Sequence, residues 1–390
     1  MMKAKYKEIR DDIPLHFNEL KLLVEERDRV FCAQQGIVIP PLEILIHPTA
    51  MCNLKCAWCI GQNITEDKND PINNTLMEEG VLSTLVDSII SYRKEVVIDD
   101  KKKIFSTKRV SFSGITGDPL IAQRVLIPQI AKLQENGIET GMFTNGLLIN
   151  NRILDILTRM NYILISVDAG SQNTYDCLKN NGKSSTNFQR LLDNIEMLNK
   201  YKNDYNRGVE INVGFVLNEM NYNEIYPLAV LLKERGVSNL RIKTDISLKY
   251  LIDESFKTLV QEQYDLVRKN LVDESFNLVE LHRITKQVDR ERYFDRCIIN
   301  KIYANISSDG FVYACNYHPA IKGVKYGNVK TVPFDEIWEN AEKDFNLSLC
   351  PRVCDPFKTR ANNMLNSYFN DTDYRNQVDS VLVDRYGYSK

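Results

Sequence analysis

Three closely spaced cysteines carry the clearest chemistry in this sequence. Cys52, Cys56 and Cys59 form a C-x3-C-x2-C motif. Thiolates this close together can converge on one metal centre, and an iron–sulfur cluster is normally held by four cysteines. Three cysteines would leave one iron of a [4Fe–4S] cluster open to a ligand from outside the protein. The motif therefore indicates a chemically active cluster.

Two other uses of these cysteines have less support. A structural zinc site needs four ligands, and here the fourth would have to be His47 or a distant cysteine. Disulfides are disfavoured because the cysteines number nine and the charged opening residues lack the apolar segment of a secretory signal. We therefore expect metal-binding thiols in a reducing, cytoplasmic compartment.

Composition excludes several functional classes. The 390 residues are 43% hydrophobic and 26% charged, as in ordinary globular proteins. No apolar run approaches the roughly 20 residues that span a bilayer. The net charge of −2 creates no general attraction for nucleic acid or anionic lipid. We expect neither a nucleic-acid nor a membrane partner.

The elements that must position the cysteines alternate between strands and amphipathic helices. This alternation predicts a parallel sheet with right-handed crossovers. The expected strands are 42–47, 109–112, 139–143, 163–167, 210–216 and 240–243. Six such units make a partial (β/α)6 TIM-like barrel, which binds ligands at the carboxyl ends of its strands. The three cysteines follow the first strand, at that end.

The chain is expected to divide into five parts. Residues 41–245 form the partial barrel, and residues 1–40 form an N-terminal helical extension. The charged stretch 246–292 has a helical pattern and is interpreted as a connector. A small second module at 293–360 contains the remaining clustered cysteines, and 361–390 forms a polar tail.

With Trp58 before its last cysteine, the three-cysteine motif resembles the signature of radical S-adenosylmethionine (radical SAM) enzymes. The resemblance implies that S-adenosylmethionine chelates the open iron. An electron from the cluster would then cleave this cofactor and release a 5′-deoxyadenosyl radical. It also implies an external electron donor of the flavodoxin or ferredoxin type.

A second segment, 113–120, resembles the Gly-Gly-Glu-Pro element of that family, although Thr116 replaces its first glycine. The resemblance implies that Thr116, Gly117, Asp118 and Pro119 contact the cofactor, with Asp118 receiving the methionine ammonium. Glycine permits close backbone approach, and a carboxylate suits an ammonium. An ordinary turn between a strand and a helix is the alternative interpretation.

Further candidates lie near the ends of later strands. The resemblance makes Ser166 and Asp168 candidates for cofactor or substrate contacts, although an ordinary strand-end turn would also explain both. Cys177 is a candidate hydrogen donor to a substrate radical, with buried packing as the alternative. Arg241 and Lys243 are positioned to contact substrate, but their spacing specifies no ligand.

The second module resembles the SPASM and twitch extensions of radical SAM enzymes. It contains a hairpin-like stretch and a G-x4-C element from Gly310 to Cys315. Its clustered cysteines are Cys297, Cys315, Cys350 and Cys354. Four cysteines fit one fully capped auxiliary [4Fe–4S] cluster, and a zinc site is the alternative.

Two histidines and one cysteine lie close to these motifs. His47 precedes the cysteine loop and is expected to order it rather than bind metal. His318 follows Cys315 and is a candidate contact of the auxiliary cluster or substrate. Cys32 is expected to be buried, because a free cysteine packs like a small hydrophobic residue.

Together these features predict a radical SAM enzyme that removes hydrogen from a small polar substrate, such as a sugar or an aminoglycoside-like molecule. Dehydrogenation, dehydration or epimerisation would follow, with the auxiliary cluster relaying an electron. A maturase that modifies a peptide or protein side chain is the alternative. A non-catalytic iron–sulfur or zinc scaffold is a third, different class.

Overall fold

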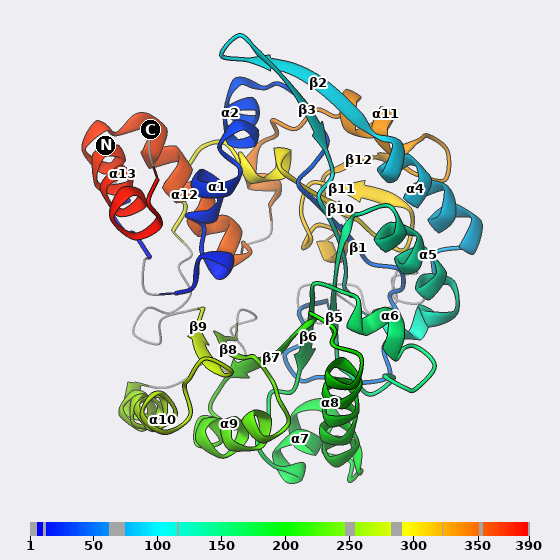
Figure 1. Ribbon diagram of the computed structural model, residues 1–390, viewed down its shortest axis with the longest axis vertical. Helices are drawn as coiled ribbons and strands as arrows, with labels where there is room; N and C mark the ends of the chain where they lie inside the picture. Colours follow the sequence, from blue (N-terminus) through cyan, green and yellow to red (C-terminus); the bar gives the residue numbers. More distant parts are fainter. Residues whose placement is uncertain are drawn as a thin grey trace.

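The computed structural model describes residues 6–10, 13–61, 75–114, 117–245, 254–281, 291–321, 323–350 and 354–388. One ten-stranded sheet lies at its centre, in the order β12-β11-β10-β1-β4-β5-β6-β7-β8-β9. Figure 1 shows this sheet curving through the molecule with its helices on the outside.

Seven consecutive strands of the sheet, from β1 to β9 in that order, are parallel. They are β1 (Glu43–Ile46), β4 (Arg109–Phe112), β5 (Glu139–Thr144), β6 (Tyr162–Ser166), β7 (Glu210–Leu217), β8 (Asn239–Thr244) and β9 (Asn277–Glu280). The expected α/β fold with a large parallel sheet is confirmed. Among the described residues the sheet stays open, with β12 and β9 as its edges.

Amphipathic helices cover the outer side of the parallel strands. They are α4 (Glu79–Ser91), α5 (Gln123–Glu135), α6 (Leu154–Thr158), α7 (Gln172–Lys179), α8 (Asn187–Asp204), α9 (Ile225–Glu234) and α10 (Lys257–Asn270). In α8, the buried residues Leu191, Leu192, Ile195 and Leu198 follow the helical repeat, so one face packs on the sheet. No described helix has the length and apolarity needed to cross a membrane.

Strand β9 was not anticipated from the sequence. The connector expected at 246–292 contains α10, but its described part also contains this short strand, which pairs in parallel with β8. Only Leu278 and Val279 are buried in it. Two apolar residues among charged ones are too few to reveal a strand by periodicity.

The C-terminal module continues the same sheet. Its strands are β10 (Tyr303–Ile306), β11 (Phe311–Tyr313) and β12 (Lys325–Asn328), followed by α11 (Phe334–Asn340). Strand β10 pairs in parallel with β1, and β10 and β11 form the expected antiparallel hairpin. On α11, the Trp338 indole Nε1 donates a hydrogen bond to the Ile39 carbonyl at 2.9 Å. The module is therefore joined directly to the barrel.

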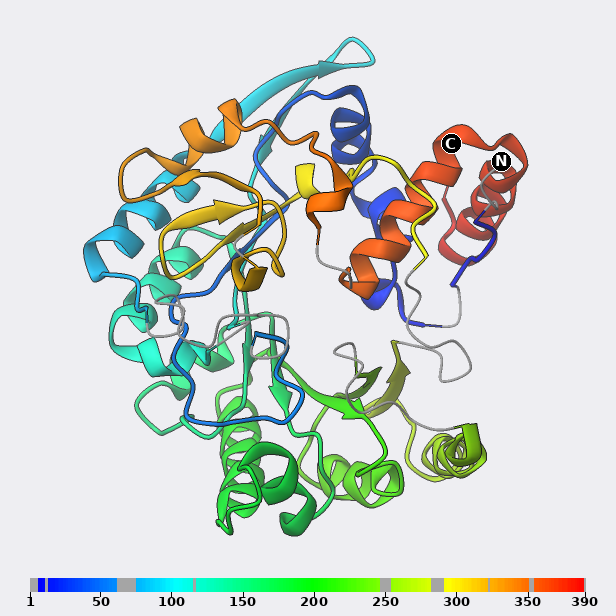
Figure 2. The ribbon, with the colours of Figure 1, turned by 180° about the vertical axis from the view of Figure 1, so that it is seen from behind.

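The two ends of the chain pack together in a second hydrophobic cluster. The helices concerned are α1 (Lys21–Glu25), α2 (Arg27–Gln35), α12 (Pro356–Asn370) and α13 (Thr372–Tyr386). Figure 2 shows α12 and α13 beside the N-terminal segment. The residues expected to form a tail after 361 are therefore helical in the described part. Asp355 caps α12 by accepting a hydrogen bond from the Lys358 N–H at 3.1 Å.

The remaining elements are short or peripheral. A separate antiparallel hairpin consists of β2 (Arg93–Ile98) and β3 (Lys101–Ser106), and it projects from the molecule in Figure 1. Single-turn 3-10 helices are η1 (Leu15–Phe17), η3 (Pro119–Ala122), η4 (Glu254–Phe256), η5 (Ile299–Lys301), η6 (Pro319–Ile321) and η7 (Leu347–Leu349).

Candidate functional site

A cavity of about 680 Å³ lies inside the curved sheet. Cys52, Cys56 and Cys59 all line it, together with residues from β1, β4, β5, β6, β7 and β8. The cysteine loop follows β1, so it lies at the carboxyl end of the parallel strands, where this class of fold binds ligands. The structure thus brings the predicted chemical motif to the mouth of one cavity.

Backbone contacts hold the cysteine loop from two sides. The Lys55 and Ala57 N–H groups donate to the carbonyls of Lys179 and Leu178, at 3.1 and 2.9 Å, at the end of α7. On the other side, the Asp118 N–H donates to the Met51 carbonyl at 2.8 Å. The loop is therefore fixed by backbone hydrogen bonds to neighbouring elements.

Glycine is required where this loop meets the segment after β4. A Cβ atom on Gly117 would lie 2.5 Å from the Thr49 carbonyl oxygen and 2.7 Å from that of Met51. Such contacts are far shorter than van der Waals distances, so a larger residue would displace one of the two loops. Gly117 therefore sets the distance between the cysteine loop and the second motif.

The three thiols form a donor set that suits a cationic metal centre. All three are free. Burial raises the pKa of the Cys56 thiol to about 12, and the Cys59 and Cys52 thiols contribute to the rise. Burial also raises the pKa of Cys52. Thiolates become stable in such a site when a metal supplies positive charge, so the donor set fits an iron–sulfur cluster.

Asp118 serves as a hydrogen-bond acceptor that joins several loops. Its carboxylate accepts from the Thr144 hydroxyl at 2.9 Å, the Asn145 N–H at 2.6 Å and the Leu120 N–H at 3.0 Å. Its side chain is buried, and burial raises its pKa. With three internal donors, the carboxylate is already engaged. These contacts join the surrounding loops, and the contact with the methionine ammonium that the family resemblance implied for Asp118 stays a prediction.

The other residues of that segment are placed differently. Pro119 is buried and begins η3, and it does not belong to the cavity wall. Thr116 lies outside the described residues. Asn145 follows β5, lines the cavity, and its side-chain amide lies 3.9 Å from the Cys52 sulfur. Asn145 was not among the residues predicted for the site, although its Thr-Asn-Gly turn follows a strand.

A buried ion pair occupies the end of β6. The Lys179 ammonium lies 2.6 Å from the Asp168 carboxylate and donates to the Ser166 carbonyl at 2.8 Å. All three residues line the cavity. Burial opposes the charge on Lys179, yet the Asp168 carboxylate and the Cys56 thiol raise its pKa. Lys179 was missed because a lysine at a helix end usually indicates solvent exposure.

Asp168 has an unusual backbone conformation. Its φ is 62°, in the left-handed region, where aspartate is tolerated better than most residues. This turn aims the carboxylate back at the sheet, where it also accepts a hydrogen bond from the Val216 N–H at 2.7 Å. Asp168 is therefore held by Lys179 on one side and by the Val216 N–H on the other.

Three further candidates are placed in contrasting ways. Trp58 is buried and lines the cavity. His47 also lines it, and neither of its ring nitrogens has a hydrogen-bond partner within the described part of the chain. Burial lowers the pKa of His47 to about 4. Cys177 is exposed on α7 and is not part of the cavity wall, so the structure does not bring it to the reacting centre.

The second set of cysteines lies behind one wall of the cavity. Burial raises the pKa of Cys350 to about 11 and raises that of Cys354, and in both cases the Cys297 and Cys315 thiols contribute. Burial also raises the pKa of Cys297. Cys350 and Cys354 therefore both lie within electrostatic reach of Cys297 and Cys315. Four thiols are the number that one fully capped [4Fe–4S] cluster requires.

Polar side chains from α12 contact this second set. The Lys358 ammonium lies 3.5 Å from the Cys315 sulfur and 3.0 Å from the side-chain amide oxygen (Oδ1) of Asn316. The Asn362 amide lies 3.4 Å from the Cys297 sulfur. Lys358 and Asn316 also line the cavity. They therefore separate the second set of thiols from the space in front of the first.

His318 has a structural contact. Its Nδ1 accepts a hydrogen bond from the Val324 N–H at 2.8 Å, and its ring is buried outside the cavity wall. It therefore holds the turn between β11 and β12. Cys32 is buried, as expected. Among the described residues, no three histidine, cysteine or acidic side chains are arranged to bind a single metal ion.

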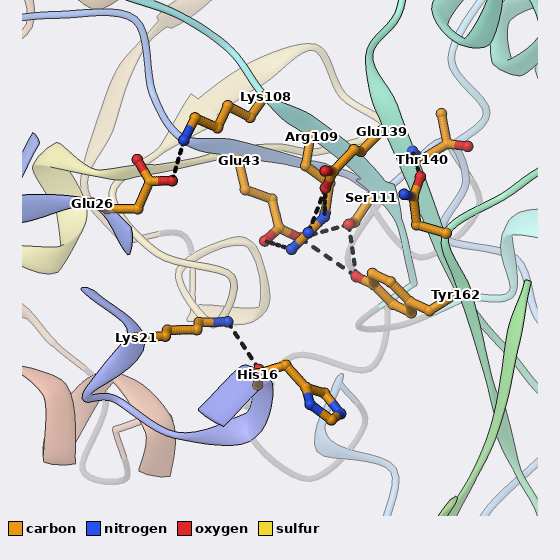
Figure 3. A network of polar contacts seen from close by, with 11 residues as sticks. His16, Lys21, Glu26, Glu43, Lys108, Arg109, Ser111, Glu139, Thr140 and Tyr162 are labelled. Atoms are coloured by element: carbon orange, nitrogen blue, oxygen red, sulfur yellow. Dashed lines mark hydrogen bonds and ion pairs between the residues drawn. The ribbon is translucent and has the colours of Figure 1, made fainter. Parts of the chain in front are cut away.

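Figure 3 shows a polar network at the amino-terminal ends of several strands, and its residues Glu43, Arg109 and Tyr162 line the cavity. The Ser111 hydroxyl lies 2.5 Å from the Glu43 carboxylate and 2.7 Å from the Tyr162 hydroxyl. Arg109 pairs with Glu139, its Nε donating at 2.9 Å. These residues lie at or near the starts of strands β1, β4, β5 and β6. The network joins these strands opposite the cysteine loop.

Two family models match this chain. Residues 46–229 match the radical SAM superfamily, and residues 297–355 match SPASM, an iron–sulfur cluster-binding domain. The matched segments contain the two sets of cysteines. Both matches support [4Fe–4S] clusters and S-adenosylmethionine as the cofactors.

Individual proteins are similar to this chain over most of its length. A cysteine-type anaerobic sulfatase-maturating enzyme of Clostridium perfringens is 22% identical over 77% of this chain and 81% of its own length. Streptococcus suis SuiB bound to its precursor peptide SuiA has a similar fold, with a TM-score of 0.57 and 16% identity over 88% of this chain and 74% of SuiB.

The structure of anSMEcpe with bound AdoMet and Cp18Cys peptide is similar as well. Its TM-score is 0.55, with 16% identity over 88% of this chain and all of that chain. At this identity the likeness concerns the fold. The two family matches, over residues 46–229 and 297–355, identify this protein as a radical SAM enzyme with a C-terminal SPASM domain.

Proposed function

We propose that this enzyme modifies a side chain of a peptide or protein substrate. The similarity to the sulfatase-maturating enzyme carries this proposal, because it extends through most of both chains. The folds of SuiB with its precursor peptide and of anSMEcpe with a peptide support it. The sequence favoured a small polar molecule as the substrate, with a peptide or protein side chain as the alternative. The similar proteins favour the peptide or protein substrate.

The first three cysteines have a defined role in this proposal. Cys52, Cys56 and Cys59 would hold the cluster, which together with S-adenosylmethionine would supply a 5′-deoxyadenosyl radical. Asp118 keeps the surrounding loops in register through its three hydrogen bonds. Trp58 contributes an apolar surface to the cofactor space.

The end of β6 orients the cofactor on the opposite side. Lys179 and Asp168 neutralise one another there, so the site can stay buried without a net charge. The backbone of Lys179 also holds the cysteine loop. Ser166 presents its side chain to the same cavity and is the candidate for a direct cofactor contact.

The second set of cysteines holds the auxiliary cluster. With all four thiolates from the protein, no iron is left open, so this cluster is suited to moving electrons. Lys358 lies between these thiols and the cavity, where a positive charge stabilises added negative charge. A flavodoxin- or ferredoxin-type protein is the proposed electron donor to the enzyme.

Hydrogen transfer from a labelled substrate tests the proposed function. Reconstituted enzyme with S-adenosylmethionine and a chemical reductant is given synthetic peptides deuterated at Cα and Cβ. A parallel reaction contains deuterated sugars and nucleosides. We expect deuterium in 5′-deoxyadenosine only in the peptide reaction, as measured by mass spectrometry.

The matched control replaces Cys52, Cys56 and Cys59 with alanine and should give no 5′-deoxyadenosine. Transfer of deuterium from sugars or nucleosides, and from none of the peptides, would return the assignment to a small polar substrate.

A further inference from the structure

We propose that Arg241 and Lys243 bind a carboxylate of the substrate deep in the cavity. The proposal rests on a peptide as the substrate and specifies that this peptide carries an acidic group. The group is either an aspartate or glutamate side chain or the C-terminal carboxylate.

Both cations point into the cavity from the same strand. Arg241 and Lys243 are two residues apart on β8, so their side chains emerge on the same face. Both line the cavity. The Arg241 guanidinium lies 4.5 Å from the ring centre of Phe17, which covers it from the N-terminal segment. β8 therefore presents two positive charges to the interior.

Neither cation has a carboxylate partner among the described residues. Their side chains make no ion pair there with an acidic group, and the buried Arg241 Nε has no hydrogen-bond partner. A buried charge is costly unless it is paired. Cation–π contact with Phe17 offsets part of that cost for Arg241. An anion from the substrate would complete the site.

The neighbouring acidic side chains already have partners. Asp168 pairs with Lys179 at 2.6 Å. Glu210 lies 3.6 Å from the His16 imidazole and accepts a hydrogen bond from Asn239. Glu43 accepts from Ser111. These contacts engage three acidic side chains of the cavity wall, and none of the three forms an ion pair with Arg241 or Lys243.

The position of Lys243 relates this site to both sets of cysteines. Burial lowers the pKa of Lys243 to about 8, and Arg241 lowers it further, while Asp355 and Asp168 oppose the change. Lys243 lines the same cavity as the first three cysteines and as Lys358, which contacts Cys315 of the second set. A peptide anchored at Lys243 would therefore lie in the cavity that the first three cysteines line.

Three synthetic probes test this site by fluorescence anisotropy with the reconstituted enzyme and S-adenosylmethionine. The first is a labelled pentapeptide amide, Gly-Ala-Asp-Ala-Gly. The second replaces aspartate with asparagine, and the third is the asparagine peptide with a free C-terminal carboxylate. We expect either the first or the third probe to bind about thirtyfold more tightly than the second, since loss of one partner of a buried charge pair has an effect of that order.

Variants identify the residues responsible. Arg241→Gln and Lys243→Gln should each remove most of the preference for the carboxylate probe, and Arg241→Lys and Lys243→Arg should retain it. Lys269→Gln, at an exposed position on α10, makes the same change in net charge and should leave the preference intact.

Equal binding of all three probes to the wild-type enzyme would overturn the proposal, whether or not the variants fold. If Arg241→Gln and Lys243→Gln lowered the affinity for S-adenosylmethionine but left the probe preference unchanged, the two cations would belong to the cofactor site. That result would also overturn the proposal. Tight binding of a carboxylate probe, combined with hydrogen transfer from no peptide, would contradict the proposed function and leave the carboxylate site standing.

Discussion

Lys179 shows how one residue can support both the cofactor end of the cavity and the cysteine loop. Its ammonium pairs with Asp168, and its carbonyl accepts a hydrogen bond from Lys55 in the loop. The family resemblance made Asp168 and Ser166, at a strand end, candidates for the site. Lys179 could not be predicted, because the partner of a buried charge depends on tertiary contacts.

Replacing Lys179 with methionine should destabilise the protein by about 3–5 kcal/mol, because the Asp168 carboxylate would stay buried without its cation. The free energy of unfolding from urea titration measures this effect. The double variant Lys179→Met/Asp168→Asn should recover most of the loss, since it removes both charges. A single variant within about 0.5 kcal/mol of wild type would contradict a buried pair.

The charge on Lys243 gives a second prediction at the residue scale. Its pKa of about 8 is set by burial and by Arg241 on the same strand, and is opposed by Asp355 and Asp168. Lys243 is therefore charged below that pH and neutral above it. Affinity for the carboxylate probe should fall as the pH rises through about 8. Lys243→Arg should abolish this dependence, because arginine stays protonated. If the affinity of Lys243→Arg for the probe fell with pH as it does in the wild type, the pH dependence would not come from Lys243.

The elements of the barrel could be predicted well from the sequence, because their apolar repeats are long. The six expected strands correspond to β1 and β4 to β8, and helices such as α8 show a full amphipathic repeat. Strand β9 could not be found, since only Leu278 and Val279 are buried in it. The same holds for the site. The spacing of the cysteines in the sequence predicted them as ligands, whereas Asn145 could be recognised only from the loops that surround it in the structure.

The contact between the cysteine loop and the segment after β4 depends on Gly117. Gly117→Ala should weaken S-adenosylmethionine binding at least about tenfold, equivalent to about 1.4 kcal/mol, because the new Cβ would push the two loops apart. Equilibrium dialysis of the reconstituted protein measures this change. Gly80→Ala is the matched control, since a Cβ on that residue of α4 meets no atom within 4 Å. Equal affinities in the two variants would exclude the steric explanation.

The two ends of the chain together form one side of the whole molecule. The N-terminal segment contributes His16, Phe17 and Lys21 to the cavity wall. Helix α12 holds this segment through the buried ion pair between Arg360 and Glu19, at 3.3 Å. The Arg360 guanidinium also donates to the Leu281 carbonyl after β9, at 3.2 Å. The N-terminal segment, the barrel edge and the C-terminal helices are therefore coupled.

Arg360→Met should lower the free energy of unfolding by about 3–5 kcal/mol, because Glu19 would keep a buried charge without its partner. Hydrogen exchange of the amides in α1 should become faster, with little change in the central strands. Arg296→Met breaks an exposed pair with Asp344 and should cost less than about 1 kcal/mol. Equal exchange in wild type and Arg360→Met would show that the ion pair does not hold the segment.

Iron content tests most directly whether the two sets of cysteines hold separate clusters. The reconstituted wild type should contain about eight iron atoms per chain, since each [4Fe–4S] cluster holds four. The variant in which Cys52, Cys56 and Cys59 are alanine should retain about four and lose the spectral change that S-adenosylmethionine causes. The variant in which Cys297, Cys315, Cys350 and Cys354 are alanine should also retain about four and keep that change. Zinc without iron in the wild type, or an iron content unaffected by either set of substitutions, would contradict the two-cluster account.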